Sequence, residues 1–249
     1  MRISRSYKRL FIFSLVINLL GLLGGGFYVY ETKSVFVYRY NKHVKGASYV
    51  EDARYYRQRL NVFHLLQKEM EGKKAIIFAG DSLIDTFEWA EYFNDLEDTM
   101  ILNRGIGGDT IERLMDRFEI TFLAGPIPNK IFIMVGINDM NRQNFDMENF
   151  IGKYHSLLEK LSSRVSPDKI CIHSILPVRL ENISSQTIKK VNESLKIYAH
   201  EKGLCYIDLY DKLADSTGQL DARYSVDGIH LTSEGYRIWL EILKPYILK

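Results

Sequence analysis

Five short apolar runs, separated by longer segments of helical period, constrain the fold of this chain more than any other feature. The runs are residues 75–79, 100–102, 131–135, 170–176 and 204–209. The longer segments are residues 110–122, 145–161, 184–200 and 233–248. Short apolar runs are typical of buried strands, and strands that alternate with helices form a parallel sheet. The sequence therefore predicts an α/β fold with three α/β/α layers around a five-stranded parallel sheet.

A different pattern precedes this domain. Residues 1–9 form a basic tail with the side chains Arg2, Arg5, Lys8 and Arg9. Residues 10–30 carry no charged side chain, and a helix that rises 1.5 Å per residue would be about 31 Å long over this stretch, the thickness of a hydrocarbon core. The sequence predicts a transmembrane signal anchor over residues 10–30. A cleaved signal peptide has the same order of basic and apolar residues and is the alternative.

The remaining chain divides into a stem and one domain. Residues 31–47 are polar, aromatic and basic without clear periodicity and are interpreted as the stem. Residues 48–249 have the length of a single domain, and apolar side chains at helical spacing predict an amphipathic helix over residues 48–70. Basic residues flank the predicted span on both sides, but they cluster on the short tail. We therefore expect a single-pass protein of the cell membrane whose domain lies outside the cell.

Charge and cysteine content exclude several classes of function. The chain has 249 residues, of which 46% are hydrophobic and 26% charged, with a formal net charge of +2. Basic residues are scattered among acidic ones, so nucleic acid is not expected as a partner. The two cysteines, Cys171 and Cys205, each lie in an apolar run. They provide neither a disulfide framework nor a metal site.

A serine lies directly after the first apolar run, within the motif Gly80-Asp81-Ser82-Leu83. A strand that ends in this way presents a hydroxyl at the carboxyl end of a parallel sheet, where open α/β folds bind ligands. Ser82 is therefore a candidate nucleophile. The alternative is that Asp81 or Ser82 only caps the following helix.

The second apolar run is followed by a glycine block, residues 105–110, which reads Gly-Ile-Gly-Gly-Asp-Thr. Its glycines permit tight or left-handed backbone, and Asp109 or Thr110 can cap the next helix. Backbone N–H groups of the block would then point into the site. The block matches neither Gly-x-Gly-x-x-Gly nor the P-loop pattern, which argues against a nucleotide site.

Two further motifs follow later apolar runs. Asn138, after the third run, has an amide that can donate a hydrogen bond to a developing oxyanion, although turn residues are also often asparagine. Asp227 and His230 stand three positions apart before the last helical segment. An aspartate at this spacing can hold one ring nitrogen and leave the other free to act as a base.

Taken in order, these motifs resemble the four sequence blocks of the SGNH (GDSL) hydrolase superfamily. The matching motifs are Gly80-Asp81-Ser82-Leu83, the glycine block, Gly136-x-Asn138-Asp139 and Asp227-x-x-His230. The glycine block in particular is similar to that of platelet-activating-factor acetylhydrolases and their bacterial relatives. The resemblance covers residues 75–248 and implies a flavodoxin-like SGNH hydrolase fold. The predicted anchor and stem are not part of it.

The resemblance also implies roles for individual residues. Ser82 would be the nucleophile, His230 the general base and then acid, and Asp227 the group that fixes the imidazole tautomer. The oxyanion hole would comprise the N–H of Ser82, the N–H of Gly108 and the amide of Asn138. No metal and no organic cofactor is implied. Asp81 and Asp139 are expected to hold turns by accepting backbone hydrogen bonds, with a metal site between such carboxylates as the alternative.

These expectations combine into a membrane-anchored serine esterase that removes short acyl groups, of which acetyl is the first candidate, through an acyl-serine intermediate. Expected substrates are acylated small molecules, lipids or cell-envelope glycans. One rival function is O-acyl transfer to envelope glycans with the same triad, since admission of water depends on the pocket. The other is a catalytically silent binding domain displayed on the membrane.

Overall fold

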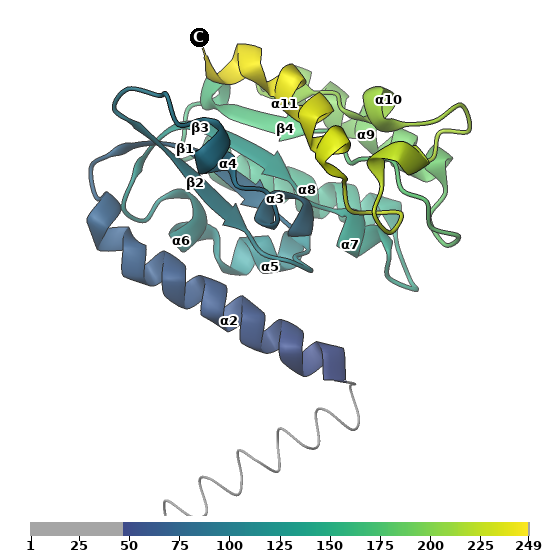
Figure 1. Cartoon of the computed structure of the whole chain (residues 1–249), viewed down its shortest axis with the longest axis horizontal. Helices are drawn as coiled ribbons and strands as arrows, with labels where there is room; N and C mark the ends of the chain where they lie inside the picture. Colours follow the sequence, from purple (N-terminus) through teal and green to yellow (C-terminus); the bar gives the residue numbers. More distant parts are fainter. Residues whose placement is uncertain (1–46, 249) are drawn as a thin grey trace, which may run out of the picture. The chain divides into compact units, whose positions relative to one another are not determined.

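The computed structural model of the protein describes residues 47–248, with side chains from residue 53. Its five strands are parallel and form one sheet in the order β2-β1-β3-β4-β5 (Figure 1). The strands are β1 (Lys74–Gly80), β2 (Thr99–Gly105), β3 (Ile127–Met134), β4 (Ile170–His173) and β5 (Cys205–Ile207). The predicted α/β fold with a five-stranded parallel sheet is confirmed.

Alternate residues of the interior strand β1 face opposite layers of helices. Ile77 packs in the larger core cluster, and Ile76 and Phe78 pack in the second cluster on the other face. The larger cluster includes residues of α5 (Ile111–Asp116), α6 (Phe118–Phe122), α7 (Ile137–Met140), α8 (Met147–Ser162) and α9 (Ser185–Glu201). The second cluster includes residues of α3 (Ser82–Asp85), α4 (Trp89–Tyr92), α10 (Tyr210–Leu213) and α11 (Ser233–Ile247). These two clusters build the predicted three layers (Figure 1).

The order in which strands are added to the sheet reverses at β1. The chain passes from β1 to β2 on one side and then to β3 on the other side of β1. In open parallel sheets, ligand sites form outside the carboxyl ends of the strands at such a switch point. The segments that follow β1, β2 and β3 therefore meet at one edge of the sheet, and they carry Ser82, the glycine block and Asn138.

Helix α2 (Ala47–Gln67) and the 3-10 turn η1 (Lys68–Met70) confirm the helix predicted over residues 48–70. Among the described residues, those from Tyr56 onward belong to one compact unit. Within residues 47–248, no helix is both long enough and apolar enough to cross a membrane. The predicted basic tail (1–9), membrane anchor (10–30) and stem (31–47, as far as residue 46) lie outside the described residues.

Several predicted elements differ in length from the observed ones, and two of these differences have a clear physical reason. The helix expected over residues 110–122 is split into α5 and α6 at Arg117, whose φ of −105° and ψ of 20° break the helical path. The strand expected over residues 170–176 ends at His173. Beyond it, the side chain of Asn192 takes the place of a neighbouring strand, because its amide bonds both the N–H and the carbonyl of Ile175 at 2.8 Å.

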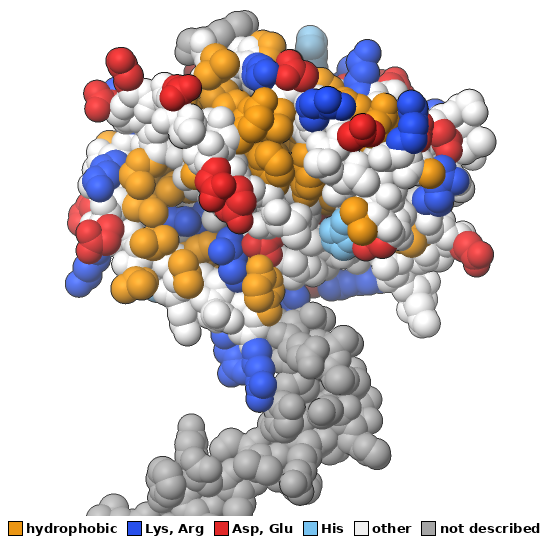
Figure 2. All heavy atoms as spheres, in the orientation of Figure 1, with side chains coloured by type: hydrophobic (Ala, Val, Ile, Leu, Met, Phe, Trp, Pro, Cys, Tyr) orange, Lys and Arg blue, Asp and Glu red, His pale blue; other side chains and the backbone are white. Residues whose placement is uncertain are grey.

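Short elements connect the longer ones, and of these the sequence predicted only a helix after Ser82, without bounds. Helices α3, α4, α7 and α10 each span four residues. Two further 3-10 turns are η2 (Pro167–Lys169) and η3 (Ala222–Tyr224). On the face shown in Figure 2, basic and acidic side chains lie interspersed, which agrees with a surface that has no single strong sign of charge.

Candidate active site

Ser82 lies at the first residue of α3, directly beyond the carboxyl end of β1. Asp81 caps this helix, because its Oδ1 accepts a hydrogen bond of 3.0 Å from the N–H of Leu83. The turn needs glycine at position 80, since a Cβ there would lie 1.8 Å from the carbonyl oxygen of Met134 on β3. The tight approach of β1 and β3 therefore fixes the point at which Ser82 leaves the sheet.

Ser82, His230 and Asp227 form one chain of hydrogen bonds. The Nε2 atom of His230 lies 2.8 Å from Oγ of Ser82, although the two residues are 148 positions apart in the sequence. The other ring nitrogen, Nδ1, lies 2.6 Å from Oδ2 of Asp227. The carboxylate thus holds one side of the imidazole, and the opposite nitrogen faces the serine hydroxyl.

Asp227 also accepts bonds from its own loop. Its Oδ1 receives the backbone N–H groups of Ile229 at 3.0 Å and His230 at 2.8 Å. Partial burial alone would raise the pKa of Asp227, but the hydrogen bonds from the backbone and ring of His230 and from Ile229 outweigh it and lower the pKa to about 2. Asp227 is therefore a carboxylate at any pH near neutral, as the pairing with the imidazole requires.

The loop that carries Asp227 and His230 is held in place by bonds at Gly228. The N–H of Gly228 donates to Oγ of Ser225 at 2.6 Å, and its carbonyl accepts from the N–H of Arg179 at 2.8 Å. Gly228 has a φ of +94°, and a Cβ there would lie 2.8 Å from the carbonyl oxygen of Arg179. Only glycine fits this left-handed turn against the neighbouring segment.

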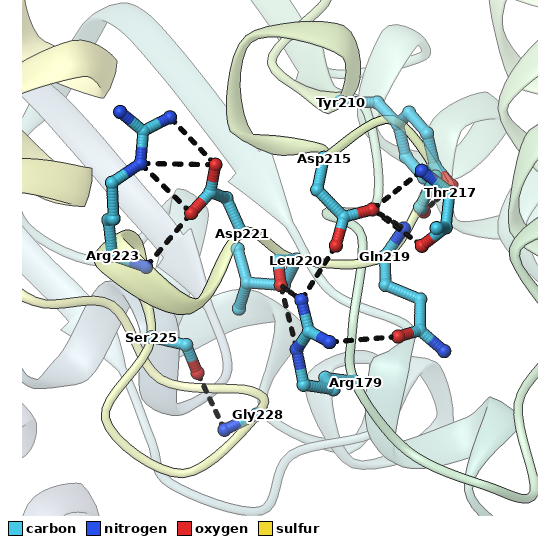
Figure 3. A network of polar contacts seen from close by, with 11 residues as sticks. Arg179, Tyr210, Asp215, Thr217, Gln219, Leu220, Asp221, Arg223, Ser225 and Gly228 are labelled. Atoms are coloured by element: carbon cyan, nitrogen blue, oxygen red, sulfur yellow. Dashed lines mark hydrogen bonds and ion pairs between the residues drawn. The ribbon is translucent and has the colours of Figure 1, made fainter.

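The side chain of Arg179 is itself held by residues of a neighbouring segment. It donates to the carbonyl of Leu220 at 2.9 Å and forms an ion pair with Asp215 at 2.7 Å (Figure 3). Figure 3 shows these contacts beside the Ser225–Gly228 bond. Sequence reasoning did not single out Arg179, because nothing in the local pattern after β4 indicates a partner so distant along the chain.

The glycine block is tied to the segments that follow β1 and β3. The N–H of Ile106 donates to the carbonyl of Gly80 at 3.1 Å. At the other end of the turn, Nδ2 of Asn138 donates to the carbonyl of Asp109 at 2.9 Å. Gly108 lies between these two bonds with a φ of +76°. An amide has two N–H donors, so the bond to Asp109 uses one of the two that Asn138 has.

Three aspartates around these turns are buried. Asp81 accepts its bond from Leu83, as expected, and Asp139 accepts one of 3.0 Å from the N–H of Ile111 at the start of α5. Burial raises the pKa of Asp81 to about 7 and that of Asp109 to about 6, in the second case against the attraction of Arg117. Burial also raises the pKa of Asp139, opposed by the bond from Ile111. The expectation that Asp81 and Asp139 hold turns is confirmed.

His173 and Trp89 are both buried and have structural contacts. His173 is buried in β4, where its Nδ1 lies 3.2 Å from the carbonyl oxygen of Ile133 and its Nε2 accepts from Trp239 at 3.3 Å. Trp89 is fully buried and stacks on Phe78 with 4.2 Å between ring centroids. Within the part of the chain that the structure describes, no group of three or more His, Cys, Asp or Glu side chains could hold a metal ion.

Comparison with known proteins places this arrangement in a family context. The model of the GDSL-like Lipase/Acylhydrolase family matches residues 78–238. The human platelet-activating factor acetylhydrolase IB subunit alpha2 is 30% identical over 178 residues, which cover 68% of this chain and 73% of that protein. The protein of the same name from Rattus norvegicus is 29% identical over 176 residues, with the same shares of both chains covered.

Solved structures share the fold. A protein from Streptococcus pneumonia superposes with a TM-score of 0.72 at 23% identity and covers 82% of this chain and 99% of its own. A GDSL-like lipase from Bacteroides thetaiotaomicron has a TM-score of 0.62 at 22% identity, with 78% and 97% covered. An acetyl xylan esterase from Geobacillus stearothermophilus has a TM-score of 0.58 at 20% identity, with 71% and 95% covered.

Proposed function

The chain belongs to the GDSL-like Lipase/Acylhydrolase family, and from this premise we propose that it is a membrane-anchored serine esterase that removes short acyl groups. The observation that carries the proposal is the hydrogen-bonded chain in which Nε2 of His230 lies 2.8 Å from Oγ of Ser82 and Nδ1 lies 2.6 Å from Oδ2 of Asp227. A serine hydroxyl is a weak nucleophile unless a base is within hydrogen-bond reach, and here one is.

The reaction follows from this geometry in two stages. His230 takes the proton of Ser82 while Oγ attacks the carbonyl carbon of the ester, and a tetrahedral intermediate forms. His230 then gives the proton to the leaving alcohol, and the acyl-serine remains. In the second stage His230 takes a proton from water, whose oxygen attacks the acyl carbon, and returns that proton to Ser82 as the carboxylic acid leaves. Asp227 stabilises the imidazolium in both stages.

The negative oxygen of the intermediate needs donors that are already in place. We assign this role to the N–H groups of Ser82 and Gly108 and to the amide of Asn138. Support comes from the bonds that draw these residues together: Ile106 to Gly80 at one end of the turn that contains Gly108, and Asn138 to Asp109 at the other.

The preference for short acyl groups has two supports. Within residues 74–248, the strands and helices follow one another through short connections, and no long insertion is present from which a lid or a deep apolar tunnel could be built. In addition, the curated relative named above is called an acetylhydrolase.

Attachment to the membrane is the part of the proposal that rests on the sequence of residues 10–30 alone. Protease added to wall-free cells that express the full chain tests it, with the domain detected by an antibody. Digestion in intact cells would support an anchored domain outside the cell. Protection until the cells are lysed would contradict the proposed orientation, and recovery of the full chain in the fraction free of membranes would contradict the anchor.

A fluorophosphonate probe tests the catalytic part of the proposal. Wild-type protein should become labelled at Ser82 and should hydrolyse p-nitrophenyl acetate, whereas Ser82→Ala should do neither. The matched control is Ser156→Ala, on the exposed surface of α8, which should react like the wild type. A wild-type protein that resists the probe and hydrolyses no ester would instead favour a silent binding domain.

A further inference from the structure

We infer that helix α2 holds the glycine block in the position that the proposed oxyanion hole requires, with Arg59 as a positioning residue. This inference rests on the proposed function, because it concerns the donors of the same site. Helix α2 (Ala47–Gln67) precedes residues 78–238, the part that the family model matches. All contacts used below come from residues of α2 within the compact unit that begins at Tyr56.

Arg59 contacts the backbone where β2 runs into the glycine block. Its Nη2 donates to the carbonyl of Gly105 at 3.1 Å and to that of Asn103 at 3.4 Å. The same nitrogen lies 3.2 Å from Oδ1 of Asp85, in an ion pair whose side chains are 23% and 6% exposed. A single guanidinium on α2 therefore joins the start of the glycine block to α3, the helix that Ser82 begins.

Asp85 also contacts the glycine block directly, at Gly107. Its Oδ2 accepts a hydrogen bond of 2.9 Å from the N–H of Gly107. Arg59 and Asp85 thus hold the carbonyl of Gly105 and the N–H of Gly107, the two polar groups that flank Ile106. The next N–H along the chain is that of Gly108, one of the proposed oxyanion donors.

Apolar packing from α2 acts at the same place. Phe63 and Ile106 are both buried, with 1% and 0% of their surface exposed, and belong to one hydrophobic cluster. The guanidinium of Arg59 lies over the Phe63 ring, 5.0 Å from its centroid. Ile106 is the only side chain between two glycines, so its packing against α2 is a direct restraint on that part of the backbone.

The glycine block needs a restraint from outside because glycine is the residue with the least intrinsic preference for one backbone conformation. Gly105 is required by a close approach, since a Cβ there would lie 2.4 Å from the backbone nitrogen of Asp85. Gly108 has a left-handed φ of +76°. Oxyanion donors contribute most when they are fixed before the charge develops. Arg59 and Phe63 supply this rigidity from an element outside the matched family region.

The test compares Arg59→Ala and Arg59→Lys with Lys68→Ala, which removes one positive charge from an exposed position just beyond α2. For each full-length variant, the second-order rate of Ser82 labelling by a fluorophosphonate is measured, because its phosphoryl oxygen also draws on the oxyanion donors. kcat and KM for p-nitrophenyl acetate and the melting temperature are measured in parallel.

In Arg59→Ala, Ser82 should be labelled on the order of tenfold more slowly, and kcat should fall by a similar factor. KM should stay within about twofold of the wild type. The reason is that the oxyanion donors are misplaced while Ser82 and His230 remain in position. Arg59→Lys should recover part of the loss and Lys68→Ala should match the wild type. If Arg59→Ala has a lower melting temperature than the wild type, Asp85→Asn is measured in its place, because this substitution weakens the ion pair at nearly constant volume. The same tenfold loss of labelling rate and kcat is expected.

The outcomes separate the two proposals. A wild-type protein that does not react with the probe overturns the proposed function itself. A wild-type protein that reacts, together with Arg59→Ala and Asp85→Asn variants that react at the wild-type rate, overturns the positioning role and leaves the proposed function standing. A higher KM for Arg59→Ala, with unchanged kcat and labelling rate, also overturns the positioning role. Substrate binding, and not oxyanion stabilisation, would then depend on Arg59.

Discussion

Arg117 and Asp109 form a buried ion pair, with 2.7 Å between guanidinium and carboxylate and with side chains that are 1% and 0% exposed. The same guanidinium donates to the carbonyl of Gly80 at 3.1 Å and to Oγ1 of Thr121 at 2.8 Å. The pair therefore joins the end of β1, two residues before Ser82, to the glycine block. It also explains the break between α5 and α6, because Arg117 lies at the break and its side chain turns inward to reach these partners.

Removal of one partner of this pair should be strongly destabilising. Arg117→Met should lower the free energy of unfolding by about 3–5 kcal/mol, because it leaves the Asp109 carboxylate buried without its counter-charge. Urea unfolding followed by circular dichroism measures the change. Arg164→Met is the control, since Arg164 pairs with Glu119 at 3.6 Å on the surface and should cost less than about 1 kcal/mol. Equal losses in the two variants would contradict this account of the pair.

Asn138 should contribute to the chemical step and little to folding. Asn138→Ala removes one proposed oxyanion donor, so kcat for p-nitrophenyl acetate should fall by roughly 10²-fold or more. Ser82→Ala and His230→Ala should lower kcat further, and Asp227→Ala should also lower it. Asn144→Ala, at an exposed position, serves as the control. A kcat for Asn138→Ala within threefold of the wild type would exclude the amide from the oxyanion hole.

Asp81 should make the stability of the domain depend on pH. Burial raises its pKa in the folded protein to about 7 from the ordinary value of 3.8. Between these values the folded state binds the proton more tightly, so a stabilising contribution present below about pH 3.8 is lost as the pH rises to about 7. Asp81→Asn does not titrate in this range. Its free energy of unfolding relative to wild type should therefore rise by about 3 kcal/mol from pH 5 to pH 8.

Urea unfolding of both proteins across this pH range measures the difference. Asn94→Ala, at an exposed position, is the control and should show a constant difference from the wild type. A difference between Asp81→Asn and wild type that also stays constant from pH 5 to pH 8 would show that the Asp81 carboxyl does not titrate in this range.

Ester chain length should affect the rate strongly. Because residues 74–248 hold no long insertion that could form a lid or a tunnel, a long acyl chain finds little apolar surface to bury it. We expect acetyl and butyryl p-nitrophenyl esters to be hydrolysed with kcat/KM at least about tenfold above the palmitoyl ester, a difference of about 1.4 kcal/mol. Rates are compared below the concentration at which the long ester forms micelles. A preference for palmitoyl would point to a lipid substrate.

Two truncations should distinguish the predicted anchor from the helix that follows it. Removal of residues 1–46 should leave the esterase rate within about twofold, because that segment contributes no proposed catalytic residue. Removal of residues 1–70 should lower kcat by tenfold or more, because Arg59 and Phe63 no longer restrain the glycine block. Equal rates for both truncated proteins would show that α2 is dispensable for catalysis.

The sequence alone predicted the order and type of the main elements and the position of each motif after a strand. This was possible because the pattern of apolar residues is a local property of the sequence. Consecutive apolar residues such as Ile76, Ile77 and Phe78 indicate a strand that is buried on both faces, whichever helices pack against it. Apart from the helix expected after Ser82, the short helices after the strands were not predicted. A four-residue helix has no period to detect, and only a capping residue such as Asp81 before α3 indicates it.

Motif spacing also indicated that Ser82, Asp227 and His230 share a site, since carboxyl ends of parallel strands meet at one edge. What the sequence did not indicate is how the site is held. The bonds from Arg59 to Gly105, from Arg117 to Gly80 and from Arg179 to Leu220 join residues 37 to 46 positions apart. A charged side chain in a helical pattern has the same local signature whether it is solvated or buried against a backbone carbonyl. Only the tertiary packing, which removes water from Arg117 and Asp85 and supplies carbonyl or carboxylate partners instead, decides between the two.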